Sequence, residues 1–392
     1  MTQLFHQLGH RYKWNIESFS TENTGNGLII APRYMSYDYV NSMNRQLKRN
    51  SIFDPQFYLP NSDRGYLQTY PFFPNVLAEG FSTAEWNVEL AKQSAEDCLA
   101  FQNDCDFQYI VIPTRYHSTP SDFIELQTNL FVEPFLNVYS SKRYDKPCLL
   151  QLILTDNMLK DEQNRNDLLN WITGLENIAG VYLIYYLSPR HKQIDDIDFL
   201  ISVMLFIRAL KVAKMTIVLG YLNTESIPLL VCDPDIVTMG SYENLRMFSL
   251  RSFQEAESEQ RGPNARIYVS KLLQWIDHQY IGIISKKVED PKGFFDDTEY
   301  RVAMFQPTYN WHFSKSEPYK HYFVSFAREF ERLLSCNASN RFSTIQDECR
   351  KAIQYYEYFD KNGIIFEQDS SGRHISYWLT ALNQYKKILE SE

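Results

Sequence analysis

The chain has little glycine and none of the glycine-rich motifs that cradle phosphate groups. Its 392 residues include 14 glycines, and neither GxGxxG nor GxxxxGKS/T occurs. Metal-binding spacings are also missing, because the eight histidines and six cysteines form no HxH, HExxH or CxxC pattern. The GxSxG motif of serine hydrolases is absent as well. We therefore expect no nucleotide or other cofactor and no metal site.

Long apolar runs are absent too. The most apolar stretch, from Phe199 to Leu210, is about a dozen residues long and contains Arg208, whereas a membrane-spanning helix needs about 20 apolar residues. The N-terminal residues are polar and lack the apolar core of a secretory signal. We therefore expect no membrane segment and a cytoplasmic location, and the scattered cysteines suit a reducing compartment.

Positive charge is in the minority. The chain has 39 Lys and Arg against 48 Asp and Glu, a net charge of −9, so no net basic field draws it toward phosphate backbones or an anionic membrane. Any contact with nucleic acid must therefore be local. Aromatic residues are plentiful, because Tyr, Phe and Trp make up 15% of the chain. This content indicates a large core and allows an aromatic-lined cleft in which a flat ligand could stack.

Short apolar segments alternate with amphipathic segments over residues 28–239, which predicts the strands and crossover helices of a parallel sheet. Seven βα steps fit a (β/α)8 TIM-like barrel better than a doubly wound sheet. Two segments, Arg266–Val269 and Ile281–Ile284, qualify weakly as the eighth strand. The seven predicted strands are Leu28–Ala31, Ser51–Phe53, Tyr109–Ile112, Leu149–Leu154, Val181–Tyr186, Met215–Leu219 and Ile236–Met239.

The segments outside this alternating pattern differ in character. Residues 1–26 are polar and end in turn residues, and the last hundred residues carry apolar side chains at helical spacing. A segment at 58–81, rich in Pro, Gly, Tyr and Phe, is too long for an ordinary connection and indicates a functional, lid-like loop. The expected division is an N-terminal arm, a barrel and a helical C-terminal region, at 1–26, 27–290 and 291–392.

Catalytic groups of such a barrel lie just past the carboxyl ends of its strands, where the loops converge on one mouth. Asp54 follows the second predicted strand and Asp156 the fourth. One carboxylate could attack an anomeric carbon while the other handles protons, so both are candidate catalytic residues. Candidate substrate-binding residues at the strand ends are Arg33, Gln56, Arg115, His117, Tyr186 and Ser241.

Each of these residue types also has a simpler explanation. Arg33 and Arg115 lie one and two residues after a proline and could hold a phosphate or a carboxylate bidentately, but they could equally form surface ion pairs. Asp54, directly before Pro55, can be a turn residue, and Asp156 can cap the next helix. The sequence leaves these alternatives open.

The strand order over residues 28–284 is accompanied by two further stretches of the chain. They are Arg266–Val269 with Leu272 and Leu273, and the segment from Lys320–Phe323 to Arg328–Glu331. Together these features resemble diverged members of the tRNA-guanine transglycosylase family, some of which lie in bacterial phage-defence gene clusters. The resemblance implies a TIM-like barrel and glycosyl transfer at a nucleic-acid base. The family's Asp-Ser-Gly-Gly motif and its zinc-binding CxCxxC are missing, so Asp54 and Asp156 match by general position only.

Two hypotheses about function follow. In the first, the barrel acts on or binds a nucleoside, nucleotide or nucleic-acid base with transglycosylase-like or glycosidase-like chemistry, and loop 58–81 stacks a base. A glycoside hydrolase is a weaker variant, since neutral sugars do not need arginines. In the second hypothesis, the barrel has lost its chemistry and serves as a binding, sensing or scaffold subunit of a complex. Its helical C-terminal region would then dock a protein partner.

Overall fold

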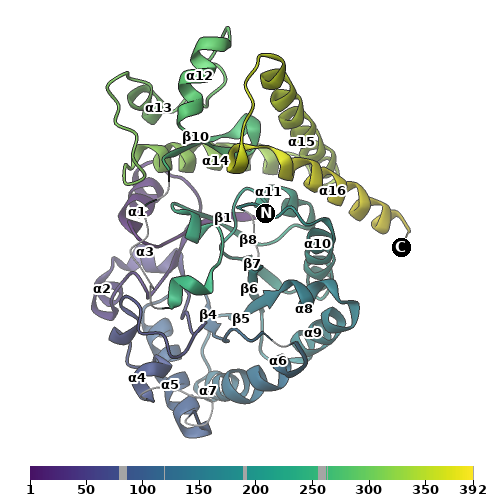
Figure 1. The fold of residues 1–392 in the computed structure, drawn as a ribbon. Coiled ribbons are helices and arrows are strands. Elements are labelled where there is room, and N and C mark those ends of the chain that lie inside the picture. The colour runs from purple at the N-terminus through teal and green to yellow at the C-terminus, as the bar shows by residue number, and fades with distance from the viewer. Residues whose placement is uncertain (79–85, 119, 189–191, 255–261, 263, 392) are drawn as a thin grey trace.

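The structure is a computed structural model that describes residues 1–78, 86–118, 120–188, 192–254, 262 and 264–391. Eight parallel strands form one sheet in the order β3-β2-β1-β8-β7-β6-β5-β4. The two edge strands also lie in contact, and the backbone N–H of Gln108 donates to the carbonyl of Ser51 at 3.0 Å. The sheet therefore nearly closes into a barrel (Figure 1). Its strands are β1 Gln3–Gln7, β2 Gly27–Ile30, β3 Ser51–Phe53, β4 Ile110–Ile112, β5 Cys148–Thr155, β6 Gly180–Tyr186, β7 Thr216–Leu219 and β8 Ile236–Gly240.

Helices connect successive strands and surround the barrel (Figure 1). A single π-helical turn, Thr128–Val132, joins α6 to α7. The architecture is that of a (β/α)8 TIM-like barrel, as the sequence predicts. The connecting helices are α1 Tyr12–Thr21, α2 Tyr37–Ser42, α3 Arg45–Arg49, α4 Pro74–Leu77, α5 Val88–Asp104, α6 Pro120–Gln127, α7 Glu133–Lys142, α8 Asp156–Lys160, α9 Glu162–Gly174, α10 Ile197–Val212 and α11 Ser226–Leu229.

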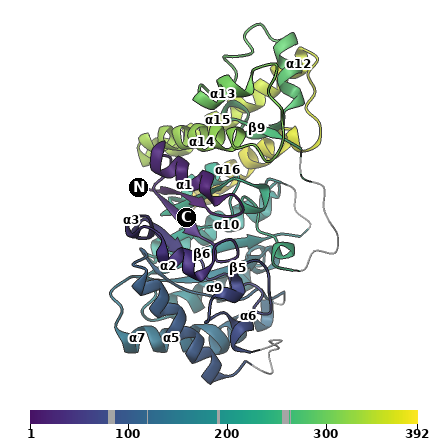
Figure 2. The ribbon, with the colours of Figure 1, turned by 90° about the vertical axis from the view of Figure 1, so that its left-hand side faces the viewer.

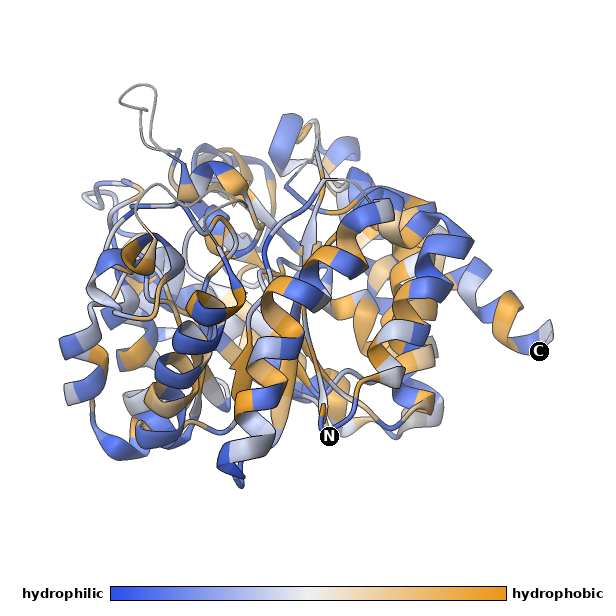
Figure 3. Cartoon of the chain, turned by 90° about the horizontal axis from the view of Figure 1, so that it is seen from below, coloured by the Kyte–Doolittle hydropathy of each residue, from blue (hydrophilic) through white to orange (hydrophobic). Residues whose placement is uncertain are grey.

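The seven predicted strands are confirmed as β2 to β8. Their apolar runs are buried on both faces, inside the barrel and beneath the helices, which is why they show no alternation. In β5, all eight residues are buried, and the strand pairs with β6 from Leu149 opposite Gly180 to Thr155 opposite Tyr186. Figure 3 shows this pattern, with hydrophobic residues on the strands and on the inner sides of the helices.

The eighth strand is neither of the two segments considered from the sequence. It is β1, within the residues expected to form an arm, and it pairs with β2 and β8 to close the gap between them. Arg266–Val269 is β9, which pairs with β10 in a separate antiparallel hairpin, and Ile281–Ile284 lies within helix α12. Local sequence concealed β1, because His6 and Gln7 break the apolar run expected of a barrel strand.

The C-terminal region is largely helical, as predicted, and lies against one side of the barrel (Figure 2). Within it, α14 packs on α1 and on β9, while α16 packs on α10. The indole of Trp378 in α16 donates to the carbonyl of Ile194 at 2.7 Å. None of the helices that the structure describes is long and apolar enough to cross a membrane. The α-helices and strands that follow the last barrel strand are β9 Arg266–Val269, β10 Gln274–Asp277, α12 Gln279–Lys287, α13 Glu299–Met304, α14 Glu317–Ser335, α15 Ala338–Lys361 and α16 Arg373–Ser391.

Candidate functional site

Asp54 lies at the carboxyl end of β3 and is fully buried inside the barrel mouth. Its carboxylate accepts hydrogen bonds from the hydroxyl of Tyr58, from Nε2 of Gln151 at 2.6 Å and from the hydroxyl of Tyr182 at 3.3 Å. The backbone N–H of Gln56 also donates to it, at 3.1 Å. We call these five residues the Asp54 cluster, and it joins the carboxyl end of β3 to residues within β5 and β6 across the barrel interior.

Burial raises the pKa of Asp54 to about 6, although its four hydrogen bonds act in the opposite direction. A carboxyl group that titrates near neutral pH is suited to proton transfer. Two polar atoms beside it have no partner among the described residues, Nε2 of Gln7 and Oε1 of Gln151. The surroundings of the Asp54 carboxyl group are thus polar.

Two aromatic side chains cover the Asp54 cluster. Phe248 and Phe253, carried by the segment after β8, contact the ring of Tyr58 edge to face, with centroids 4.9 and 5.0 Å away. We call these two phenylalanines the aromatic cover. The crevice between the cover, Arg33 and Tyr221 has no room for a water molecule. Asp54 therefore cannot meet a ligand in this conformation.

The second predicted carboxylate does not join the cluster. Asp156 begins helix α8 and is half-buried, and the structure describes no hydrogen bond or ion pair of its carboxylate. Gln56, in contrast, is fully buried and links the cluster to other strand ends: its side chain accepts from the backbone N–H of Arg33 at 2.9 Å and donates to Tyr221 at 3.0 Å.

The remaining candidates lie around the mouth. The amide of Gln127 holds the backbone of Arg115 with two hydrogen bonds of 3.0 Å, and burial lowers the pKa of the Arg115 guanidinium. His117 follows Arg115 by two residues in the chain and is half-buried. The ring of Tyr186 lies against the cover, 6.2 Å from Phe248. Ser241 is buried, and its hydroxyl has no partner among the described residues.

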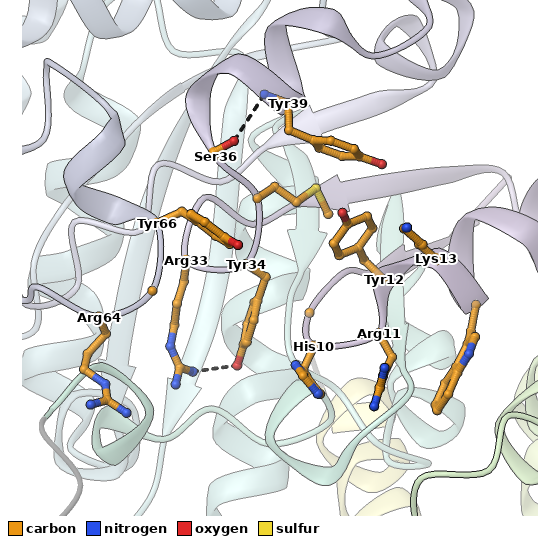
Figure 4. Close-up of a pocket in the computed structure, with 14 residues that line it drawn as sticks. His10, Arg11, Tyr12, Lys13, Arg33, Tyr34, Ser36, Tyr39, Arg64 and Tyr66 are labelled. Atoms are coloured by element: carbon orange, nitrogen blue, oxygen red, sulfur yellow. Dashed lines mark hydrogen bonds between the residues drawn. The ribbon is translucent and has the colours of Figure 1, made fainter.

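An open groove of about 610 Å³ lies beside the mouth, at the carboxyl ends of β1 and β2 (Figure 4). Its walls come from three segments of the chain, 9–14, 33–39 and 64–66. No Asp or Glu is among the described residues that line it. We call it the basic groove, since its polar lining is dominated by His10, Arg11, Lys13, Arg33 and Arg64, beside the aromatic residues Tyr12, Trp14, Tyr34, Tyr39 and Tyr66.

The charges of the basic groove are largely uncompensated by the protein. The guanidinium of Arg33 donates to the hydroxyl of Tyr34 at 2.6 Å, and its Cζ lies 4.8 Å from that ring's centroid. Burial, Arg11 and Arg33 together lower the pKa of His10, so this imidazole is neutral at pH 7. The structure describes no ion pair with a carboxylate for the groove's four permanent cations, Arg11, Lys13, Arg33 and Arg64.

Local backbone geometry builds one end of the groove. Gly65 has a φ of +63°, and a Cβ placed on it would lie 2.0 Å from the carbonyl oxygen of Arg33. Only glycine therefore lets the loop approach this closely. The next backbone N–H, of Tyr66, donates to the same carbonyl at 3.1 Å. This contact holds Arg64 and Tyr66 beside the end of β2.

Most aromatic side chains of the predicted stacking loop belong to the core. Residues 79–81 of the segment 58–81 lie outside the described residues. Of its aromatic side chains, Tyr58, Tyr70, Phe72 and Phe73 are buried in the core, whereas Tyr66 is 50% exposed. The aromatic content mostly fills the barrel, and Tyr66 alone of these five offers an open ring.

Sequence reasoning missed most of the basic groove. Of the predicted site residues, only Arg33 lines it, because the other basic residues of the groove do not directly follow a predicted strand. The sequence carries a usable signal, since the run from Arg11 to Trp14 alternates basic and aromatic residues, a pattern typical of nucleic-acid contacts. Among the described residues, no group of three or more His, Cys, Asp or Glu is placed to hold a metal ion.

Comparisons with known proteins add little to this description. No protein-family model matches the chain, and no curated protein matches it. Among solved structures, the chain is similar to the crystal structure of dihydrodipicolinate synthase from Oceanobacillus iheyensis, with 12% sequence identity and a TM-score of 0.26 over 99% of this chain and 97% of that one. Nothing about activity follows from this likeness. The TIM-like barrel is established by the strand topology, and the resemblance to tRNA-guanine transglycosylases stays a prediction.

Proposed function

We propose that the basic groove binds a ligand that carries both phosphate and an aromatic ring, the chemistry of a nucleotide. The observation that carries the proposal is the set of four cations in one open groove lined with aromatic rings, for which the structure describes no carboxylate partner. Guanidinium groups are well suited to phosphate, and aromatic faces to bases. The net charge of the chain is −9 and does not attract phosphate, so a local site with positive charge is needed for such a contact.

The proposal concerns binding rather than catalysis. Glycosyl transfer or glycosidic cleavage at Asp54 and Asp156 is not part of it, because Asp54 is enclosed and its hydrogen bonds are made within the protein. This favours the second of the two hypotheses, a binding or sensing barrel. A place in phage defence and a protein partner at the C-terminal region stay predictions from the sequence.

Binding of labelled adenosine monophosphate and of a labelled oligonucleotide, measured by fluorescence anisotropy, tests the proposal. We expect the wild type to bind at least one of them, and the double variant Arg33→Ala, Arg64→Ala to bind about a hundredfold more weakly, since each charge-assisted contact contributes about 1.5 kcal/mol or more. Lys361→Ala, at an exposed position on α15, is the matched control and should bind like the wild type. If the wild type binds neither probe, or the double variant binds as well as the wild type, the proposal is wrong.

A further inference from the structure

Three of the four cations of the basic groove form a row instead of converging on one point. In Figure 4, Arg64, Arg33, His10 and Arg11 follow one another along one rim, and Tyr34 lies between Arg33 and His10. The contacts agree with this order. Arg33 is joined to the 64–66 loop through its carbonyl, and Arg11 directly follows His10 in the chain.

Two arginines of the row lie against an aromatic ring. The Cζ of Arg33 lies over Tyr34, and that of Arg11 lies 5.9 Å from the centroid of Trp14. Tyr66 follows Arg64 by two residues and exposes half of its surface. The groove therefore repeats a unit of one cation and one ring, supplied in turn by the start of α1, the end of β2 and the 64–66 loop.

This repeat differs from the geometry of a site for a single phosphate. A lone phosphate is held by donors that point at one centre, often with backbone N–H groups at a helix N-terminus. In contrast, a single strand of nucleic acid repeats a phosphate and a base, and proteins bind it with basic grooves that follow the backbone and aromatic rings that stack the bases. The lining of the basic groove matches the second pattern.

We propose that the ligand of the basic groove is a single strand of nucleic acid, with several consecutive nucleotides laid along the row from Arg64 to Arg11. This inference rests on the proposed function and specifies its ligand. The cations would each contact a different phosphate, and the exposed ring of Tyr66 would stack a base. Since the protein contacts read the backbone and the base faces, we expect weak dependence on base identity.

A length series separates this inference from the proposed function. The probes are thymidine monophosphate and thymidine oligonucleotides of two, four and six nucleotides, with the matching uridine series, measured by anisotropy between 50 and 200 mM salt. We expect about a tenfold or greater gain in affinity from one to four nucleotides in at least one series. The logarithm of the binding constant should fall with that of salt concentration by about 0.7 for each phosphate neutralised, hence by about 2 or more for the tetranucleotide.

Variants assign the effect to the row. Arg64→Ala should lower the salt dependence for the tetranucleotide by about 0.7. Tyr66→Ala should weaken tetranucleotide binding about fivefold or more, because stacking of one base contributes about 1 to 3 kcal/mol, and Tyr66→Phe, which retains the ring, should restore it. Circular dichroism and melting temperature would confirm that these surface variants fold. Lys361→Ala is again the control.

The outcomes are distinguishable. If the monophosphate binds as tightly as the tetranucleotide, the single-strand inference falls and the proposed function stands. If no probe of any length binds, both fall. Equal affinity for a duplex of the same length also overturns the inference, because paired bases cannot stack on Tyr66. Retention of full tetranucleotide affinity by Tyr66→Ala would overturn it as well.

Discussion

The Asp54 cluster and the basic groove lie close together on one barrel and treat charge in opposite ways. Asp54 is fully buried and receives four hydrogen bonds from the protein, as the desolvation of a buried carboxylate requires. The four groove cations stay accessible to the groove and have no described carboxylate partner. Asp54, the predicted catalytic carboxylate, thus forms its hydrogen bonds within the protein. The cations without a described carboxylate partner lie outside the mouth, in the groove for which we propose binding.

The largest effect that tests this comparison is on stability. Asp54→Ala would leave the hydroxyls of Tyr58 and Tyr182 and the amide of Gln151 without their acceptor, so we expect the free energy of unfolding to fall by about 4 kcal/mol in urea denaturation. Asp156→Ala is the matched control and should cost about 1 kcal/mol or less. Equal effects of the two substitutions would show that the cluster contributes little to the fold.

The burial of Asp54 should also make the stability of the protein depend on pH. Burial raises the pKa of Asp54 from 3.8 to about 6 in the folded protein, so between these values the folded state holds a proton that the unfolded state has released. Stability should therefore fall by about 3 kcal/mol as pH rises from 4 to 6, and this contribution should be flat above that. The difference between unfolding curves of the wild type and Asp54→Asn isolates the effect. Parallel curves for the two proteins would contradict it.

A smaller effect is expected where the groove depends on glycine. Gly65→Ala would place a methyl group 2.0 Å from the Arg33 carbonyl at a positive φ, so we expect a loss of about 2 kcal/mol in unfolding free energy. Ligand binding should weaken too, because Arg64 and Tyr66 would move. Gly174→Ala, where a Cβ meets nothing within 4 Å, is the control. It should leave stability unchanged or slightly raised, and a similar loss there would remove the argument.

The smallest effect is expected for the groove cations themselves. Lys13→Ala and Arg64→Ala should change the unfolding free energy by no more than about 0.5 kcal/mol in chemical denaturation, because the structure describes no ion pair for either side chain. Lys320 is the contrast, since its Nζ lies 2.8 Å from a carboxylate oxygen of Glu17 and the side chain is buried. Lys320→Ala should cost more than either. A large loss at Lys13 or Arg64 would mean that the groove is structural.

Most of the barrel could be predicted because its signals are local. Seven strands are runs of apolar residues that must be buried on both faces, and the runs alternate with amphipathic helices. The first strand gave no such signal. His6 lies in β1, where it is buried, and its ring packs 4.8 Å from that of Phe323 in α14. Both ring nitrogens of His6 also form hydrogen bonds, Nε2 with Thr24 and Nδ1 with Asn15, and these contacts make a buried polar residue acceptable in a barrel strand.

The candidate site was predictable only in part. Asp54, Gln56 and Arg33 lie at strand ends, so their convergence on the mouth followed from the fold class. The sequence does not show whether the mouth is open, because Phe248 and Phe253, which cover Tyr58, are distant from it in the chain.

The sequence alone determined the parallel barrel, its largely helical C-terminal region and the set of polar residues at the strand ends, because periodicity and burial act within a few neighbouring residues. Only the tertiary structure decided that Asp54 is enclosed and that residues 9–14, 33–39 and 64–66 form one basic groove. Both outcomes depend on contacts between segments far apart in the chain, and burial, hydrogen bonding and the compensation of charge are settled where such segments meet.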